Sequence, residues 1–496
     1  MRAARTATGA DARSGNRPLR TLRHIFFWGL PAAFACAGLA LPRVACALPT
    51  PLPAQMAAKI NRVVAQEMLR ERVPGAAVAV TRNGVIIFTN GYGRRTLDDM
   101  APADAATHFE IGSITKQFTA AATLQLKEAN RISLNDRLSK YLPDFPHARQ
   151  ITLLELLGQT SGLPDYVTPS DLIHGASSVK GYDAVVAAIR DRPLVFAPGT
   201  RWGYSNTNYI ALGRVIEIVS GVTYEAYVRT HLFAPADMRE TVTIDDEPRL
   251  NDMATGYRIV DGAVRASPAS GPIWFWSAGE FVSTVDDLAK WDAALASGKI
   301  VSATDYHLMQ AGGRTSTSMA TDYGFAWFVD TYGAHPRVWH SGLTLGFDAV
   351  NVVFPSDQIA IIALVNNGNA DAMALANDVF GILIPAAATA QRRIQDADDR
   401  AVLTRAQNCL DQLRNGNLDR SQLNPQLNHS LTPQMLAQTA AQLRAWGKPT
   451  SLSLVRKTVR GGISMFVYRA TFGAGGWDYV FGLDSAGKIA TLQLSP

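Results

Sequence analysis

The sequence predicts an α+β protein, and three observations lead to this prediction. Runs of residues typical of strands occur near the start of the chain and again in its second half, and the sequence between them mostly has the pattern of helices. Beyond these runs, a separate C-terminal part reads as helices followed by further strand-like runs. At 496 residues the chain is long enough for more than one domain and for a large buried core.

The first expected elements are a helix and a hairpin. Between Ala54 and Arg72, apolar residues recur at helical intervals, at Ile60, Val63, Val64 and Met68. Two apolar runs, Ala76 to Val80 and Val85 to Phe88, then flank Asn83-Gly84. Because both of these turn residues tolerate positive φ, the pair predicts a β-hairpin.

The middle of the chain is expected to be helical before strands return. Apolar residues with helical spacing mark three segments, Gln117 to Ala129, Tyr209 to Val219 and Val285 to Ala296. Later strands are expected at Arg337 to Trp339, Ala349 to Phe354 and Ile359 to Val365.

The C-terminal part is expected to form a small α+β domain over residues 403–496. Residues 386–402 are rich in Ala, Gln, Arg and Asp, which predicts a linker or a solvated helix. Helices are expected at Leu403 to Leu413 and at Pro433 to Leu443, the second with Thr432 as its cap. The strand-like runs that follow are Ser451 to Val455, Ile463 to Thr471, Trp477 to Leu483 and Ile489 to Leu494. This domain weakly resembles cystatin-like or NTF2-like domains, and no chemistry is assigned to it.

Residues 1–47 are expected to be an export signal. They combine seven Arg with one Asp, an apolar run from Ile25 to Leu41 and the small-residue cleavage site Ala45-Cys46-Ala47. Cleavage after Ala47 predicts an exported protein, periplasmic or secreted. A retained membrane anchor is the alternative, although the apolar run is at the short limit for spanning a bilayer. A lipoprotein is disfavoured, because Arg43 fits the small apolar residues of a lipobox poorly.

Composition excludes several classes of function. Of 47 basic and 42 acidic residues, the part after the leader keeps 40 and 41, so no electrostatic argument favours nucleic acid as a partner. Only Cys409 remains after cleavage, which leaves no internal disulfide, and the nine His are scattered. No metal and no cofactor are therefore expected. The chain also lacks the Gly-x-Ser-x-Gly elbow of α/β-hydrolases.

Three short motifs carry the predicted chemistry: Ser113-Ile-Thr-Lys116, Tyr204-Ser205-Asn206 and His340-Ser341-Gly342. A Ser and a Lys three residues apart lie on one face of a helix, so the Lys116 nitrogen sits beside the hydroxyl that it must activate. Tyr204 adds a second proton carrier, and Asn206 adds an amide that can hold a substrate carbonyl. If the third motif lies on a strand edge, it borders the groove for an acyl substrate.

A Ser-x-x-Lys motif alone is a weak signal, because it recurs at Ser177 and Lys180. Ser113 differs in that it follows an apolar run and opens a helical segment. Structural roles compete with the chemical ones: Ser113 could be a helix N-cap, Lys116 a surface charge and Tyr204 a core aromatic residue. The order and spacing of all three motifs favour the chemistry.

With these motifs the chain resembles the penicillin-binding-protein and class C β-lactamase superfamily of serine hydrolases. The Tyr-Ser-Asn motif is similar to that of the class C and DD-peptidase branch. Further text that resembles the family lies at Val73-Pro74-Gly75, Ile151 to Leu157, Thr160 to Tyr166, Phe196 to Gly199 and Ser283 to Leu288. The resemblance covers residues 54–385 and implies one antiparallel sheet flanked by helices, with an all-helical subdomain.

The resemblance also implies a role for each motif residue. Ser113 Oγ would attack an amide, lactam or ester carbonyl, and Lys116 would be its base if the lysine pKa falls from about 10.4. Tyr204 would carry the proton to the leaving group and later activate water. The backbone N–H groups of Ser113 and Leu343 would form the oxyanion hole, in which losing one donor costs about 3 kcal/mol.

The remaining motif residues are expected to contact the substrate. Asn206 would orient a substrate amide, and Ser341 would border the groove. His340 would give a substrate carboxylate a hydrogen bond or, when protonated, a charge. Gly342 would be needed because a side chain there would block substrate approach.

Two departures leave the substrate open. His340 stands where most β-lactamases carry Lys, and Gln159 stands where relatives often have His. Both weaken a β-lactamase assignment more than a serine-hydrolase assignment, and DD-peptidase, D-amino-acid amidase and esterase activities remain rivals. The alternative from another class is a non-catalytic penicillin-binding or sensing protein. The expected partner is a small-molecule or peptide substrate, such as one derived from the cell wall; a membrane would enter only through an uncleaved leader.

An aromatic cluster, Trp274-Phe275-Trp276, also has two interpretations. It could wall the substrate pocket, or it could be plain core.

Overall fold

The computed structural model describes residues 51–167, 179–267, 274–460, 463–473, 475–484 and 486–495. The chain divides into two units, Met1–Leu48 and Pro49–Pro496, and every described residue belongs to the second unit. The expected leader and Ser177 of the second Ser-x-x-Lys match lie outside the described residues.

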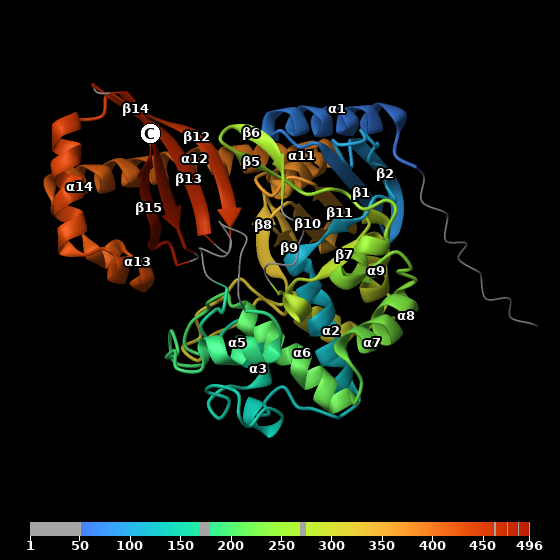
Figure 1. Cartoon of the computed structure of the whole chain (residues 1–496). Helices are drawn as coiled ribbons and strands as arrows, with labels where there is room; N and C mark the ends of the chain where they lie inside the picture. The colour runs from blue at the N-terminus through green and yellow to red at the C-terminus, as the bar shows by residue number, and fades with distance from the viewer. Residues whose placement is uncertain are drawn as a thin grey trace, which may run out of the picture. The chain divides into compact units, whose positions relative to one another are not determined.

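A six-stranded antiparallel sheet joins the early and the late strands in the order β2-β1-β11-β10-β9-β8 (Figure 1). The hairpin strands are β1 (Gly75–Arg82) and β2 (Val85–Gly93), and the positive φ of Asn83 (53°) and Gly84 (74°) confirms the predicted turn. The late strands are β8 (Phe328–Tyr332), β9 (His335–Leu343), β10 (Asp348–Phe354) and β11 (Ile359–Val365). Val78 of β1 lies opposite Ala363 of β11, so segments far apart in sequence meet at the centre of the sheet.

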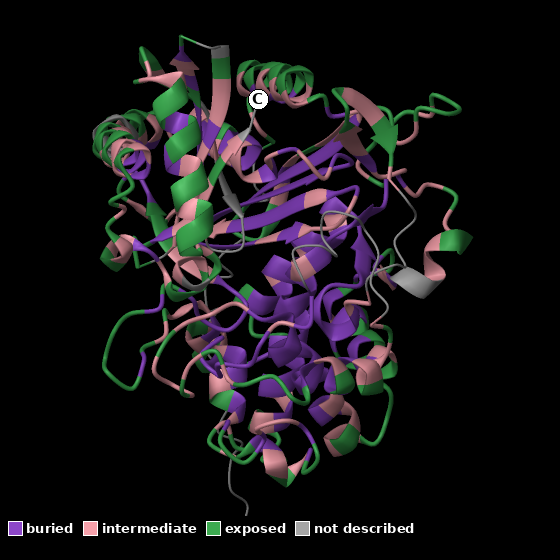
Figure 2. Ribbon diagram, turned by 60° about the vertical axis from the view of Figure 1, so that its left-hand side comes forward, coloured by how far each residue is buried: buried purple, intermediate pink, exposed green. Residues whose placement is uncertain are grey.

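Each face of this sheet is covered by its own layer of helices. Ala77 and Ala79 of β1 belong to a core shared with α2 (Thr115–Glu128) and α9 (Val285–Ala296). The intervening residues of β1 belong to a second core, with α1 (Ala54–Glu71) and α11 (Ala372–Leu383). Alternate side chains of a strand point to opposite faces, which is why one strand serves both cores. Figure 2 shows the buried residues continuing from the strands into the helical region.

The helical subdomain contains short helices and small sheets around α2. Its longest further helix is α6 (Asn206–Ser220), and α3 (Leu153–Leu157) opens with a capping box between Thr152 and Glu155. Within the described residues, further helices of this part are α5 (Tyr182–Ile189), α7 (Tyr224–Val228), α8 (Ala234–Ala236) and α10 (Ala303–Gln310). A small sheet in this part is formed by β3 (Phe109–Glu110), β7 (Phe281–Ser283) and β4 (Val242–Thr243). A separate hairpin of β5 (Tyr257–Val260) and β6 (Ala263–Ala266) lies beside the main sheet, where Tyr257 N donates to Asn366 O just after β11 (Figure 1).

As far as its residues are described, the C-terminal part contains three α-helices and a four-stranded meander. Helix α12 (Pro385–Asn415) includes residues 386–402, so this stretch, expected to be a linker or a solvated helix, continues into the helix of the C-terminal part. The strands β12 (Ser451–Arg460), β13 (Ile463–Phe472), β14 (Gly475–Leu483) and β15 (Ile489–Ser495) pair in sequence order. The other helices are α13 (Pro425–Ser430) and α14 (Pro433–Trp446), the latter capped by Thr432. Among the described residues, no helix is both long and apolar enough to cross a membrane.

Candidate active site

Ser113 lies in a 3₁₀ turn, Gly112–Ile114, that leads directly into α2. The N-cap of α2 is Ile114, and no side chain caps this helix, so the structure does not use Ser113 as a cap. Its hydroxyl is hydrogen-bonded instead to the other two predicted catalytic residues. Lys116 Nζ lies 2.9 Å from Ser113 Oγ, and Tyr204 Oη also lies 2.9 Å from it.

Lys116 is fully buried, and its nitrogen has three oxygen neighbours. Besides Ser113, these are Asn206 Oδ1 at 2.8 Å and the backbone carbonyl of Ala278 at 2.6 Å. Burial penalises the ammonium and lowers the pKa of Lys116 to about 7, while the charge of Asp165 opposes this shift. A substantial fraction of Lys116 is therefore neutral near neutral pH.

The neighbours of Lys116 decide where the lone pair of its neutral form points. Asn206 Oδ1 and the Ala278 carbonyl can only accept hydrogen bonds, so they take the two N–H groups of the amine. Ser113 is the one of the three neighbours with a proton to give. The lone pair is thus directed at the Ser113 hydroxyl, as a general base requires.

Tyr204 belongs to a second segment of the chain, the turn before α6, and its hydroxyl donates a hydrogen bond to Ser113 Oγ. Burial raises the pKa of its phenol well above the ordinary value, so Tyr204 keeps its proton and can donate it. The ring also lies 4.9 Å from Lys116 Nζ, where its electron-rich face stabilises a cation. Tyr204 can therefore hand a proton onward while it steadies the lysine after that lysine is protonated.

Two residues outside the predicted set hold the Tyr204-Ser205-Asn206 turn. Gln159 is buried, and its Oε1 accepts hydrogen bonds from the backbone of Ser205 at 3.0 Å and from Asn208. Asp165 Oδ2 accepts a hydrogen bond from Asn206 Nδ2 at 2.9 Å. The sequence predicts no role for either residue: Gln159 stands out only as a departure from the family, and Asp165 lies within the family-like segment Thr160 to Tyr166.

The end of β9 presents its backbone to Ser113. Thr344 N donates to Phe347 O, so Thr344 and Phe347 form a hydrogen-bonded pair. Hydrogen-bonded and non-hydrogen-bonded pairs alternate along antiparallel strands, and the next pair is Leu343 with Asp348. The Leu343 N–H therefore points away from β10. On that side, β8 pairs with β9 only as far as Trp339. A Cβ added to Gly112 would lie 2.8 Å from Leu343 N, so the turn that carries Ser113 abuts this open strand end. The two expected oxyanion donors thus lie in one corner of the site.

Gly342 is required by the packing of two backbone segments. A Cβ at this position would lie 1.8 Å from the carbonyl oxygen of Ile111 and 3.1 Å from Ser113 N. This close approach alone excludes a side chain, and the expectation that a side chain would also block the substrate stays a prediction. The glycine lets β9 touch the nucleophile turn.

We expect Gly342→Ala to destabilise the fold by about 1–3 kcal/mol, as overpacking of a filled interior does, because β9 must move away from Ile111. Denaturant unfolding of the purified protein measures this change. Gly312→Ala is the matched control, since a Cβ there meets no atom within 4 Å. Equal stability of the two variants would contradict the close approach.

His340 is buried and neutral, which contradicts the expectation that it could offer a charge. Burial and the nearby Lys116 lower the pKa of His340 to about 3. Its Nδ1 lies 2.7 Å from Ser341 O, which can only accept, so Nδ1 carries the proton. Nε2 then accepts from the hydroxyl of Tyr323 at 3.1 Å. Both ring nitrogens are used inside the protein.

The aromatic cluster Trp274-Phe275-Trp276 was expected to be either a wall of the substrate pocket or part of the core, and its residues differ in burial. Trp276 is buried, stacks on Trp274 and presses against Gly213 of α6, so it belongs to the core. Trp274 and Phe275 are half-buried. The same segment ends in the 3₁₀ turn Trp276–Ala278, whose last carbonyl accepts from Lys116. Its clearest contribution to the site is therefore a backbone oxygen.

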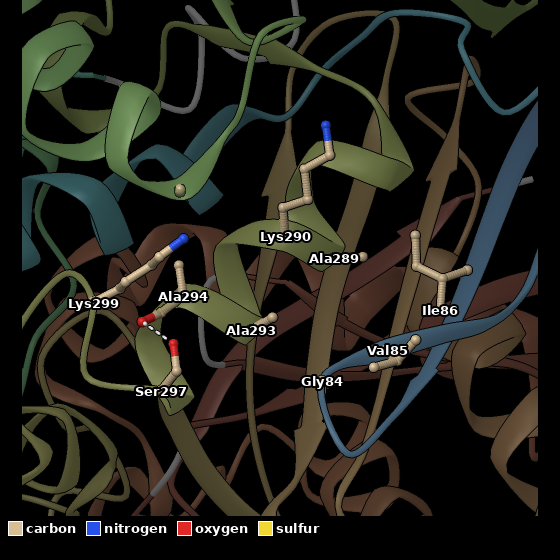
Figure 3. A pocket seen from close by; sticks show the side chains of 10 residues that line it. Gly84, Val85, Ile86, Ala289, Lys290, Ala293, Ala294, Ser297 and Lys299 are labelled. Carbon is tan, nitrogen blue, oxygen red and sulfur yellow. Dashed lines mark hydrogen bonds between the residues drawn. The ribbon is translucent and has the colours of Figure 1, made fainter. Parts of the chain in front are cut away.

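A surface pocket of about 430 Å³ lies away from these motifs (Figure 3). It is lined by the hairpin turn at Gly84, by the first residues of β2, Val85 and Ile86, and by alanines of α9, together with Lys290 and Lys299. None of the motif residues lines it. Among the described residues, no cluster of three or more His, Cys, Asp or Glu could hold a metal ion.

Comparison with known proteins identifies the family of the chain. The Beta-lactamase family matches residues 60–381. The chain is similar to Protein flp of Staphylococcus aureus (strain MW2), with 27% identity over 315 residues that make up 62% of this chain and 62% of that relative. It is 31% identical over 317 residues to the putative penicillin-binding protein PbpX of Bacillus subtilis (strain 168), covering 61% of this chain and 74% of the relative.

Solved structures share the fold. An octameric penicillin-binding protein homologue from Pyrococcus abyssi superposes with a TM-score of 0.62 at 22% identity, covering 87% of this chain and 94% of that one. A D-amino acid amidase from Ochrobactrum anthropi SV3 superposes with a TM-score of 0.56 at 22% identity, covering 69% of this chain and 99% of that one. Since the family match also extends over more than half of the sequence, the chain belongs to the Beta-lactamase family, whose β-lactamase/transpeptidase-like fold generally serves serine hydrolases.

Proposed function

We propose that the protein is a serine hydrolase that works through an acyl-enzyme on Ser113. One observation carries this proposal: Lys116 Nζ and Tyr204 Oη both lie 2.9 Å from Ser113 Oγ, and the other two neighbours of Lys116 are pure acceptors. A neutral Lys116 takes the Ser113 proton as Oγ bonds to the substrate carbonyl carbon. The resulting oxyanion is met by the N–H groups of Ser113 and Leu343.

The second half of the reaction uses the same residues. Tyr204 gives its proton to the leaving group, and Lys116 returns a proton to Tyr204, so that both residues regain their starting states. A water molecule then attacks the acyl carbon, and its proton follows the reverse path while Ser113 is released.

The substrate proposed is an amide, lactam or ester. His340, neutral and occupied by internal hydrogen bonds, favours substrates that need no cation at this position. A D-amino acid amidase and a D-stereospecific amidohydrolase from Streptomyces are among the structures with the same fold. We therefore place amides and neutral esters ahead of penicillins. A non-catalytic binding protein is the second candidate, and the intact contacts around Ser113 disfavour it.

One panel of reagents distinguishes these functions. The mature protein is incubated with a fluorescent penicillin, a fluorophosphonate, p-nitrophenyl esters and D-amino acid amides, and adducts and turnover are measured. We expect a fluorophosphonate adduct together with turnover of esters or amides. A stable penicillin adduct without turnover of any substrate would favour the binding protein, and no reaction at all would refute the hydrolase.

The neutral His340 leads to a pH prediction. The ratio of kcat/KM for a carboxylate-bearing ester to that for its neutral analogue should stay flat between mildly acidic and mildly basic pH, because a pKa of about 3 keeps the imidazole uncharged throughout. The titration of Lys116 affects both substrates and cancels in the ratio. A ratio that drops as pH rises through neutrality would reveal a protonated His340 at the substrate.

Export remains a further proposal. We expect mature protein purified from its own cells to begin near Leu48 and to be found outside the cytoplasm, because residues 1–47 have the pattern of a cleaved signal. N-terminal sequencing of the fractionated protein checks this. Cytoplasmic protein that still begins at Met1 would contradict it.

A further inference from the structure

The loop that follows α3 brings a carboxylate to the first turn of α6. Thr207 of that turn donates to Pro164 O at 2.7 Å and accepts from Tyr166 N at 3.2 Å, so the loop is fastened on both sides of Asp165. The Asp165 carboxylate accepts from Val167 N at 3.1 Å through Oδ1 and from Asn206 Nδ2 at 2.9 Å through Oδ2. Its place is therefore set by main-chain and side-chain contacts together.

Asn206 connects this carboxylate to the catalytic lysine. Its Oδ1 accepts from Lys116 Nζ at 2.8 Å, and its Nδ2 donates to Asp165. If the amide turned over, its NH₂ group would face the ammonium and its oxygen would face the carboxylate, which are two repulsive contacts. Asp165 thus selects the orientation in which Asn206 serves Lys116, and the second hydrogen of Nδ2 is left for a substrate carbonyl.

The carboxylate also lies at a favourable place for its own charge. Ser205, the N-cap of α6, makes no side-chain capping bond, and the carboxylate stands at this positive helix end. Burial raises the pKa of Asp165 to about 6, while its hydrogen bonds and Lys116 favour the charged form. Asp165 is therefore ionised at the pH at which Lys116 exchanges its proton.

We propose that Asp165 is the positioning residue of the catalytic lysine: its carboxylate fixes the Asn206 amide and, through it, supplies the counter-charge for Lys116 when this residue takes up the Ser113 proton. The role rests on the proposed function, because it matters only if Lys116 is the base. Nothing is transferred to Asp165 itself; the proton moves from Ser113 Oγ to Lys116 Nζ, and the charge pair that results is Lys116⁺ with Asp165⁻.

Other titratable groups face this pair from each neighbouring segment. Tyr204 and Tyr209 present their rings to Lys116, at 4.9 and 5.7 Å, and the charge of Lys116 is felt by His340 on β9. Around Asp165, the phenols of Tyr166 and Tyr204 feel its charge, and Arg192 donates to its backbone carbonyl at 2.7 Å. The phenols and His340 are neutral near neutral pH, so among these groups Asp165 and Lys116 are the pair that titrates there.

The test is the pH dependence of Ser113 labelling by a neutral fluorophosphonate, which reports acylation alone. In the parent, the labelling rate should rise with pH as Lys116 loses its proton, and this rising part of the pH profile is its acid limb. In Asp165→Asn the counter-charge is gone and the pKa of Lys116 falls. The acid limb should therefore shift to a pH about one unit lower. The rate on the plateau should also fall, because a base with a lower pKa is a weaker base. Asp165→Glu restores the charge and should restore the position of the limb.

Controls separate this role from a structural one. Asp183→Asn removes an exposed carboxylate from the first turn of α5 and should leave limb and plateau unchanged. If Asp165→Asn fails to fold, Asp165→Ser is the second neutral variant, with the same expected shift. A neutral variant that folds and keeps the limb of the parent overturns the proposal. Absence of Ser113 labelling in the parent would instead refute the proposed function.

Discussion

Replacing Ser113 by Ala should abolish fluorophosphonate labelling and reduce hydrolysis on the order of 10⁶-fold, as loss of a nucleophilic serine does in other hydrolases. The reason is that Ser113 Oγ is the one nucleophile held by both Lys116 and Tyr204. Rates of labelling and turnover of purified variants measure the effect.

Ser177→Ala is the control for this substitution, since it alters the other Ser-x-x-Lys of the sequence. We expect it to label and turn over like the parent. Ser113→Ala removes a single oxygen atom, and this oxygen does not cap helix α2. The thermal unfolding temperature of the variant should therefore change little. Comparable losses in the two variants would refute the assignment of the nucleophile.

Replacing Lys116 by Met should slow acylation by about 10²–10⁴-fold, the usual contribution of a general base. Methionine fills a similar volume without a charge, which makes it a better probe than Ala at a fully buried position. In the parent the labelling rate should rise as pH increases through about 7, because the neutral fraction of Lys116 grows there.

The methionine variant should lose this rise along with the rate. Its residual reaction would depend on water or on Tyr204, whose phenol keeps its proton near neutral pH because burial raises its pKa. A variant that is folded by thermal unfolding and circular dichroism, yet keeps the parental rate and acid limb, would show that Lys116 is not the base.

The elements that local patterns determine could be predicted from the sequence. Helix α9 runs from Val285 to Ala296 as expected, because its apolar spacing agrees with a Thr284 cap that accepts from Asp287 N. The hairpin at Asn83-Gly84 follows from the backbone preferences of two residues. The contact between Ser113 and Lys116 could be predicted for the same reason, since a spacing of three residues on a helix places two side chains together.

What the sequence could not supply are contacts between distant segments. Asp165 and Asn206 are 41 residues apart in the sequence. They are in contact because Thr207 donates a hydrogen bond to the carbonyl oxygen of Pro164 and so holds the loop against α6. The Ala278 acceptor is a backbone oxygen, which no residue type reveals. The neutral state of His340 depends on burial and on Tyr323 from another segment. Strand β8 was not predicted either, because its middle residues Asp330 and Thr331 are polar and exposed and interrupt any apolar run.

The most direct test of a Ser113 acyl-enzyme is peptide mapping by mass spectrometry of the mature protein after reaction with a fluorophosphonate. We predict one adduct per chain, on the peptide that contains Ser113, formed faster as pH rises through about 7. An adduct on a peptide with another serine, such as Ser177 or Ser341, or hydrolysis that persists while Ser113 stays unmodified, would contradict the account.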